Sequence, residues 1–182
     1  MRKSILLLLL ASFMASCSVS NRITPMNDSA NKSKKISLTQ VLETHSADIK
    51  ASTKNRSDFK INSTYLFEEK KNTRPLVTVN FRILNSGYTD MLQPDMFIEL
   101  GDERIRIDSG NHIKNQLNII PENLWISIVC SQKISWILYS GKETINLQLN
   151  QLQTTKLKEF FEQAIQKSVA KFPAIPDGKK KW

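Results

Sequence analysis

The stretch that decides the fold lies near the carboxyl end, where residues 134–171 read ISWILYSGKETINLQLNQLQTTKLKEFFEQAIQKSVAK. Its first part predicts two strands, 134–139 and 145–149, joined by a turn. The second strand alternates apolar and polar residues, which indicates a hairpin with one buried face. The remainder predicts a long helix over 151–171, capped by Asn150 and ended by Pro173. Its apolar face is formed by Leu152, Leu157, Phe160, Phe161, Ala164, Ile165 and Val169.

Further strands are predicted upstream by short runs rich in β-branched and aromatic residues. These runs cover 59–67, 76–84, 96–100 and 103–107. A polar loop joins the first two into a hairpin, and Gly101-Asp102 forms a turn between the last two. Residues 112–120 are ambiguous and leave a further strand open.

The segment 121–131 fits two structures. Pro121 at the first helical position and Glu122 in the first turn favour a helix. The isoleucines and valine between 126 and 129 favour a strand. We expect a short helix.

These elements predict an α+β fold, with an antiparallel sheet of about six or seven strands and a long C-terminal amphipathic helix packed on it. We expect a single domain over 37–172. It would begin with a short helix in 37–50, capped by Ser37 and Gln40. The strands and helices do not alternate as in a doubly wound nucleotide-binding sheet. Residues 173–182 form a basic tail that we expect to be mobile.

The first seventeen residues indicate export. Arg2 and Lys3 precede an apolar run from Ile5 to Met14, and the small residues Ala15 and Ser16 stand directly before Cys17. A run of this length suits a signal peptide over 1–16 and is shorter than the roughly 20 residues of a membrane-spanning helix. Two other interpretations are an ordinary signal peptide followed by a chance cysteine, and a buried N-terminal helix.

Met14-Ala15-Ser16-Cys17 resembles the lipobox of bacterial lipoproteins in its relaxed, Bacteroidota-like form, with Met14 where most members have leucine. The resemblance covers only the leader and assigns no family to the mature domain. It implies that Cys17 carries a diacylglycerol, with fatty acids such as palmitate, and becomes the first mature residue. Residues 17–36 then read as the lipidated cysteine and a flexible polar tether. Ser18 and the lack of an acidic cluster after Cys17 favour an outer-membrane anchor facing the periplasm.

Charge and export limit the partners. Removing residues 1–16 takes away Arg2 and Lys3 and leaves a formal charge of +7 from the original +9. The basic residues can simply form a solvated surface. If they have a counter-charge, export favours an anionic lipid or lipopolysaccharide surface over nucleic acid. Lys32, Lys34 and Lys35 could rest on such headgroups, although a solvated tether explains them equally well.

The remaining reactive residues point to core positions or to no site. Cys130 lies in an apolar run and is predicted to be a small core residue without a disulfide partner. Trp125 and Trp136 are also expected in the core. His45 and His112 stand far apart and lack the spacing of a metal site. Five glycines are too few for a phosphate-binding loop. Because none of these patterns forms a site, we expect no catalytic residue, cofactor or metal.

Two classes of function remain. The first is a non-enzymatic, lipid-anchored binding or assembly module, such as a subunit of an envelope or secretion machine, with a protein partner in the envelope. The second is a small-ligand carrier or hydrolase whose site gathers scattered carboxylates at one sheet edge. The candidates for that site are Asp90, Asp95, Glu99, Asp102 and Glu103.

Overall fold

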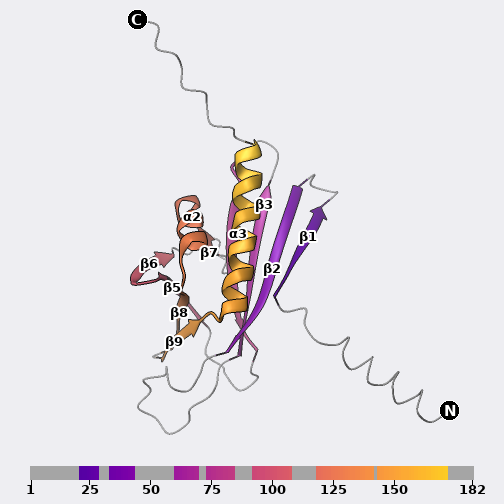
Figure 1. Ribbon diagram of the computed structural model, residues 1–182. Coiled ribbons are helices and arrows are strands. Elements are labelled where there is room, and N and C mark those ends of the chain that lie inside the picture. The colour runs from indigo at the N-terminus through magenta and orange to yellow at the C-terminus, as the bar shows by residue number, and fades with distance from the viewer. Residues whose placement is uncertain are drawn as a thin grey trace, which may run out of the picture.

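The described part of the chain forms an α+β structure of two antiparallel sheets and two helices (Figure 1). The computed structural model describes residues 21–28, 33–43, 60–69, 73–84, 92–107, 118–141 and 143–171. A five-stranded sheet has the order β1-β2-β3-β4-β7. Its strands are β1 (Arg22–Asp28), β2 (Ser33–Glu43), β3 (Lys60–Glu69), β4 (Leu76–Ile83) and β7 (Asn118–Ile120).

A second, four-stranded sheet has the order β6-β5-β8-β9. Its strands are β5 (Leu92–Leu100), β6 (Glu103–Ile107), β8 (Ile134–Ser140) and β9 (Glu143–Gln148). The prediction of one sheet with six or seven strands was therefore wrong in its arrangement. Strand periodicity shows which residues face inward, but it does not show which strands share a sheet.

The predicted hairpins are confirmed. β3 pairs with β4, β5 with β6, and β8 with β9, all antiparallel. The turn between β5 and β6 contains Gly101 at φ 66°, a left-handed conformation that glycine adopts without steric cost. The ambiguous segment 112–120 contributes the short strand β7, and residues 112–117 lie outside the described part of the chain.

The first hairpin, β1–β2, corrects two predictions. Residues 22–28 and 33–36 were assigned to a flexible tether but lie in paired strands, and residues 37–43 were assigned to a helix but continue β2. Ser37 faces Thr24 across the hairpin, and so it caps no helix. Ile36, Leu38, Gln40 and Leu42 are all buried on one side of β2, which is the period of a strand. Polar Gln40 breaks the apolar alternation, which hid this period.

The helices predicted in 121–131 and 151–171 are confirmed. Helix α2 (Glu122–Cys130) buries Leu124, Trp125 and Ile128, and α3 (Gln151–Lys171) packs across the five-stranded sheet beside it. Two residues of the predicted apolar face of α3 differ, because Leu152 and Val169 are exposed at its two ends. Leu152 precedes Leu157 by five residues, which places it about 140° away round the helix, and Val169 lies in the last turn of α3.

The core joins three layers at Tyr65 on β3. Its ring centroid lies 6.1 Å from that of Phe160 on α3 and 6.2 Å from that of Trp136 on β8. Trp136 also contacts Phe81 on β4 edge-on, and Trp125 lies 6.3 Å from Phe67 on β3. Trp125 and Trp136 are both buried, as predicted. One face of the large sheet is thus covered jointly by the helices and the second sheet.

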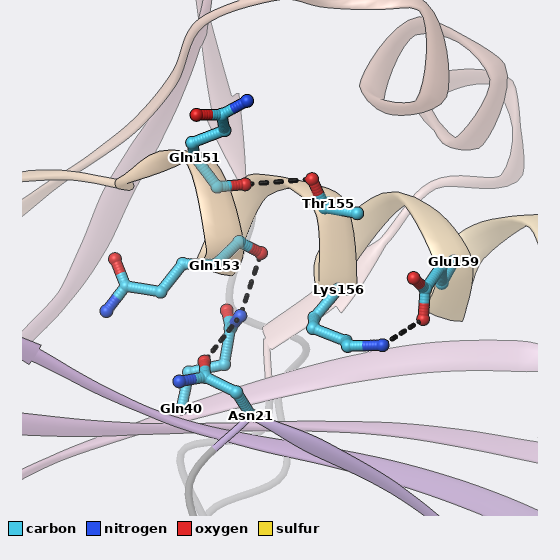
Figure 2. Close-up of polar contacts among 7 residues, drawn as sticks. All are labelled: Asn21, Gln40, Gln151, Gln153, Thr155, Lys156 and Glu159. Carbon is cyan, nitrogen blue, oxygen red and sulfur yellow. Dashed lines mark hydrogen bonds and ion pairs between the residues drawn. The ribbon is translucent and has the colours of Figure 1, made fainter.

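A polar network ties the start of α3 to β2 (Figure 2). The side-chain amide of the fully buried Gln40 donates to the Gln153 carbonyl at 2.8 Å, and Gln153 Nε2 donates to the Val41 carbonyl at 2.9 Å. Asn150 and Gln153 also exchange backbone–side-chain hydrogen bonds, both 2.9 Å, which confirms the predicted cap. The network sets the position of α3 along the sheet, which apolar contacts alone define less sharply.

Replacing Gln153 should test this network. Gln153→Ala removes two part-buried side-chain hydrogen bonds, to the Val41 carbonyl and the Asn150 N–H, and we expect a loss of about 1–3 kcal/mol in the free energy of unfolding. Urea denaturation followed by circular dichroism measures it. Gln166→Ala, at an exposed position of the same helix, is the matched control and should change stability by less than about 0.5 kcal/mol. Equal stability of the two variants would contradict the role of the network.

The hydroxyl of Tyr65 is an unusual group in this core. It is buried and forms no hydrogen bond of standard geometry. Burial raises the pKa of Tyr65 well above its usual value of 10.0, and the nearby side chains of Ser63 and Trp136 offset this only in part. Tyr65 therefore stays neutral in the folded protein at pH values where the unfolded chain would ionise.

This pKa predicts a loss of stability in alkali. Because the unfolded tyrosine ionises above pH 10 and the folded one does not, the folded state should lose about 1.4 kcal/mol for each pH unit above 10 through Tyr65 alone. Tyr65→Phe should lack that part of the loss, as measured by urea denaturation at pH 8 and pH 11. Tyr139→Phe is the control and should keep the loss, because Tyr65 is still present. A Tyr65→Phe variant with the wild-type pH dependence would show that the hydroxyl does not cause it.

Candidate functional site: the open face of the five-stranded sheet

Several residues singled out in the sequence lie outside the described residues. These are the proposed lipid attachment site Cys17, both histidines (His45 and His112) and Asp90. The basic tail 173–182 lies outside them as well. The predictions for these residues stay predictions.

Two acidic residues of the proposed hydrolase site are paired with arginines. Asp95 Oδ1 lies 2.6 Å from Arg106 Nη2, and Glu99 Oε1 lies 2.7 Å from Arg104 Nη2. Asp102 and Glu103 are exposed at the turn and the start of β6. A hydrolytic carboxylate pair needs two acids directed at one substrate, whereas each of these two carboxylates contacts an arginine on the neighbouring strand. The structure thus arranges Asp95 and Glu99 as surface ion pairs.

Metal binding finds no support in the placed side chains. Within the described ranges, no group of three or more His, Cys, Asp or Glu residues is arranged to hold a metal ion. No described helix is both long and apolar enough to cross a membrane.

The prediction for Cys130 was wrong, because its thiol is exposed. The apolar run containing it is helical, and α2 buries Leu124, Trp125 and Ile128 along one side. Cys130 follows Ile128 by two residues, which places it about 200° further round the helix. The exposed Ile126 is a second residue of this run that faces away from the core. In a strand, Ile126, Ile128 and Cys130 would all lie on one face and would not differ in burial in this way.

A small cavity lies where the two sheets meet. It is lined by Phe81, Leu92, Gln93, Pro94, Met96, Asn118 and Leu138. It has room for about one water-sized molecule, and the buried Asn118 Oδ1 has no hydrogen-bond partner in the structure. A cavity of this size suits a structural water and is too small for an organic substrate.

Among the described residues, neither the helices nor the second sheet cover the outer face of the five-stranded sheet. Both described helices and the second sheet pack on the opposite, inner face (Figure 1). On the outer face, one cross-strand row aligns Arg22, Thr39, Thr64 and Asn80. The next row aligns Thr24, Ser37, Leu66, Thr78 and Ile119. We call these two rows the open face.

Charge is distributed unevenly around the open face. Arg22 stands at its β1 edge, and its other residues are uncharged and carry hydroxyl, amide or aliphatic groups. Ion pairs stand beyond its two ends, with Lys35 Nζ 3.1 Å from Glu68 Oε1 at one end and Lys60 Nζ 3.1 Å from Glu43 Oε1 at the other. An uncharged centre with a charged rim is the usual anatomy of a protein–protein interface. An antiparallel sheet can also leave one face open simply to solvent. In that case, charged residues have no reason to be absent from the centre of the face.

Sequence reasoning missed this surface because two of its strands, β1 and β2, were assigned to a tether and a helix. The signal that could have found it is the alternation in 35–42. Ser37, Thr39 and Val41 stand between buried Ile36, Leu38, Gln40 and Leu42. The outer residues of β3 and β4, including Thr64 and Thr78, follow the same alternation.

Comparisons with protein-family models, with curated proteins and with solved structures found no match to this chain.

Proposed function

We propose that this protein is a lipid-anchored envelope protein that acts as a non-enzymatic binding or assembly module. It is anchored in the bacterial outer membrane through Cys17, and its domain faces the periplasm. The observation that carries the binding role is the open face, with an uncharged centre and ion pairs at its rim. The occupant is a second envelope protein that presents a neutral, hydrogen-bonding surface.

The address is supported by the leader. A basic start, an apolar run of about ten residues and Ala15-Ser16-Cys17 fit a lipoprotein signal peptide. Two or more acyl chains anchor a protein stably, since each buried CH₂ contributes about 0.8 kcal/mol. A single folded domain attached in this way suits a subunit that recruits or supports a partner at the membrane.

The side chains of the open face are suited to protein contact rather than to chemistry. Thr39, Thr64 and Thr78 offer hydroxyl groups on stiff, β-branched side chains that lose little freedom on binding. Leu66 and Ile119 add apolar contact in the same row. Because all these residues lie in paired strands, their spacing is fixed before the partner arrives.

Cys17→Ala tests the anchor. We expect the variant to lose labelling by a radioactive fatty acid and to leave the membrane fraction, because the lipid supplies the attachment. Fractionation and metabolic labelling of cells producing the full-length chain measure both. Ser18→Ala is the control and should keep both properties. A Cys17→Ala protein that stays in the membrane would exclude the lipoprotein assignment.

Thr64→Arg tests the open face. The substitution places an unpaired charge at the uncharged centre, and we expect partner affinity to fall by about 2 kcal/mol or more, roughly 30-fold. The measurement is crosslinking in intact cells, with the crosslinked envelope proteins quantified by mass spectrometry.

Thr144→Arg is the matched control for this experiment. Thr144 is exposed on β9, in the second sheet, so the same change should leave the crosslinks at the wild-type level. Thermal unfolding of both variants shows that they are folded. Crosslinks that persist unchanged in a folded Thr64→Arg protein would exclude the open face as the binding surface.

A further inference from the structure

The folded part of the chain begins close to the proposed lipid. Asn21 is held on β2, because its backbone N–H donates to the Thr39 carbonyl at 2.7 Å and its Oδ1 accepts from Gln40 Nε2 at 3.3 Å. Its φ of 69° is left-handed, a conformation that asparagine tolerates better than most residues. Figure 2 shows Asn21 beside Gln40 under the start of α3. The position of Asn21 is therefore fixed relative to the whole fold.

Only three residues, 18–20, separate Cys17 from Asn21. Four Cα–Cα steps span at most about 14 Å, whatever conformation those residues adopt. A domain of about 150 residues has a radius of gyration near 15 Å and hence a diameter of roughly 40 Å. A lipid on Cys17 therefore brings the side of the domain that carries Asn21 to the bilayer, and it cannot hold the domain off the membrane as a long tether would.

That side of the domain is the outer edge of the five-stranded sheet. β1 is the edge strand, and its Arg22, Thr24 and Met26 are exposed, the last by 49%. Lys34, at the start of the adjoining β2, is exposed as well. Cations are attracted to anionic headgroups, each by a factor of about five in affinity, and a methionine side chain can enter the apolar boundary.

We propose that the β1 edge lies on an anionic lipid bilayer, with Arg22 and Lys34 over the headgroups and Met26 at their boundary with the acyl chains. The proposal rests on the lipidation of Cys17 proposed above. It also covers the edge strand, because phosphate oxygens and headgroup water accept hydrogen bonds from the backbone N–H groups of β1 that no described strand pairs.

This orientation defines a near side and a far side. The strand order β1-β2-β3-β4-β7 runs away from the bilayer. Helix α2, which ends at Cys130, lies on the side of α3 opposite to β1 (Figure 1). The two sides can be distinguished by fluorophores, because the lipidated chain has Cys130 as its single free thiol.

The experiment compares two fluorophore positions on the acylated, full-length protein. The protein is reconstituted into vesicles of phosphatidylglycerol and phosphatidylcholine that contain a lipid with a nitroxide on its headgroup. One sample carries the fluorophore on the native Cys130, and the other carries it on Met26→Cys in a Cys130→Ser background. We expect the label at position 26 to lose most of its fluorescence and the label at position 130 to keep most of it. Thr24→Cys is a second near-side position if Met26→Cys fails to fold.

A charge-reversal pair tests the headgroup contact. Arg22→Glu combined with Lys34→Glu should reduce the quenching at position 26 in anionic vesicles. Lys133→Glu is the control, because Lys133 is exposed next to the second sheet, and it should leave the quenching unchanged.

The outcomes separate this proposal from the one on which it rests. A protein that takes up two fluorophores per chain and does not float with vesicles has no lipid on Cys17, and this result overturns both. A protein that takes up one fluorophore, floats with vesicles and shows equal quenching at positions 26 and 130 overturns the orientation alone. Quenching at position 26 that is unchanged by the charge-reversal pair overturns the headgroup contact of Arg22 and Lys34.

Discussion

The structure depends on covering one face of a five-stranded sheet with two different elements at once. Tyr65 on the middle strand marks the junction, since its ring contacts Phe160 of the helix on one side and Trp136 of the second sheet on the other. Helix α3 alone is too narrow, because a helix is about 10 Å across whereas five strands spaced about 4.8 Å apart span roughly 20 Å. The helix and the second sheet must therefore share the inner face. This arrangement leaves the outer face open.

Sequence patterns predicted the elements whose signals are local. The hairpins of β3–β4, β5–β6 and β8–β9 follow from alternation and turn residues, and α3 follows from its cap and apolar spacing. Pro121 and Glu122 outweighed the β-branched run that follows them, so α2 was also predicted. Trp125 and Trp136 were correctly predicted in the core, because both lie in apolar runs and burying a large aromatic side chain removes much apolar surface from water.

What the sequence could not show depends on contacts distant in the chain. Gln40 is buried at a position where alternation calls for an apolar side chain, and its partner, the Gln153 carbonyl, lies 113 residues later. Without that partner, 37–50 is compatible with a short amphipathic helix. The polar composition of 18–36 similarly resembles a tether, although pairing with β3 gives β2 a buried side. The candidate site was missed for the same reason, since the open face exists only once β1 and β2 are strands. The division of strands between two sheets likewise follows from packing around Tyr65 and Trp136, and no local pattern encodes it.

The correction at β1 links the two proposals in a physical way. If residues 18–36 formed a free tether, the domain would take any orientation and the open face would point in all directions. Because the chain is instead fixed from Asn21, the proposed lipid on Cys17 would orient the sheet edge-on to the bilayer. An edge-on sheet presents its broad faces sideways, and the inner face is already covered. The open face would then meet partners that diffuse in the same membrane. Because the membrane already restricts the rotation of the domain, binding costs less rotational entropy. A short link to the lipid is thus an advantage for a module that binds membrane neighbours, whereas a long tether suits capture of soluble ligands.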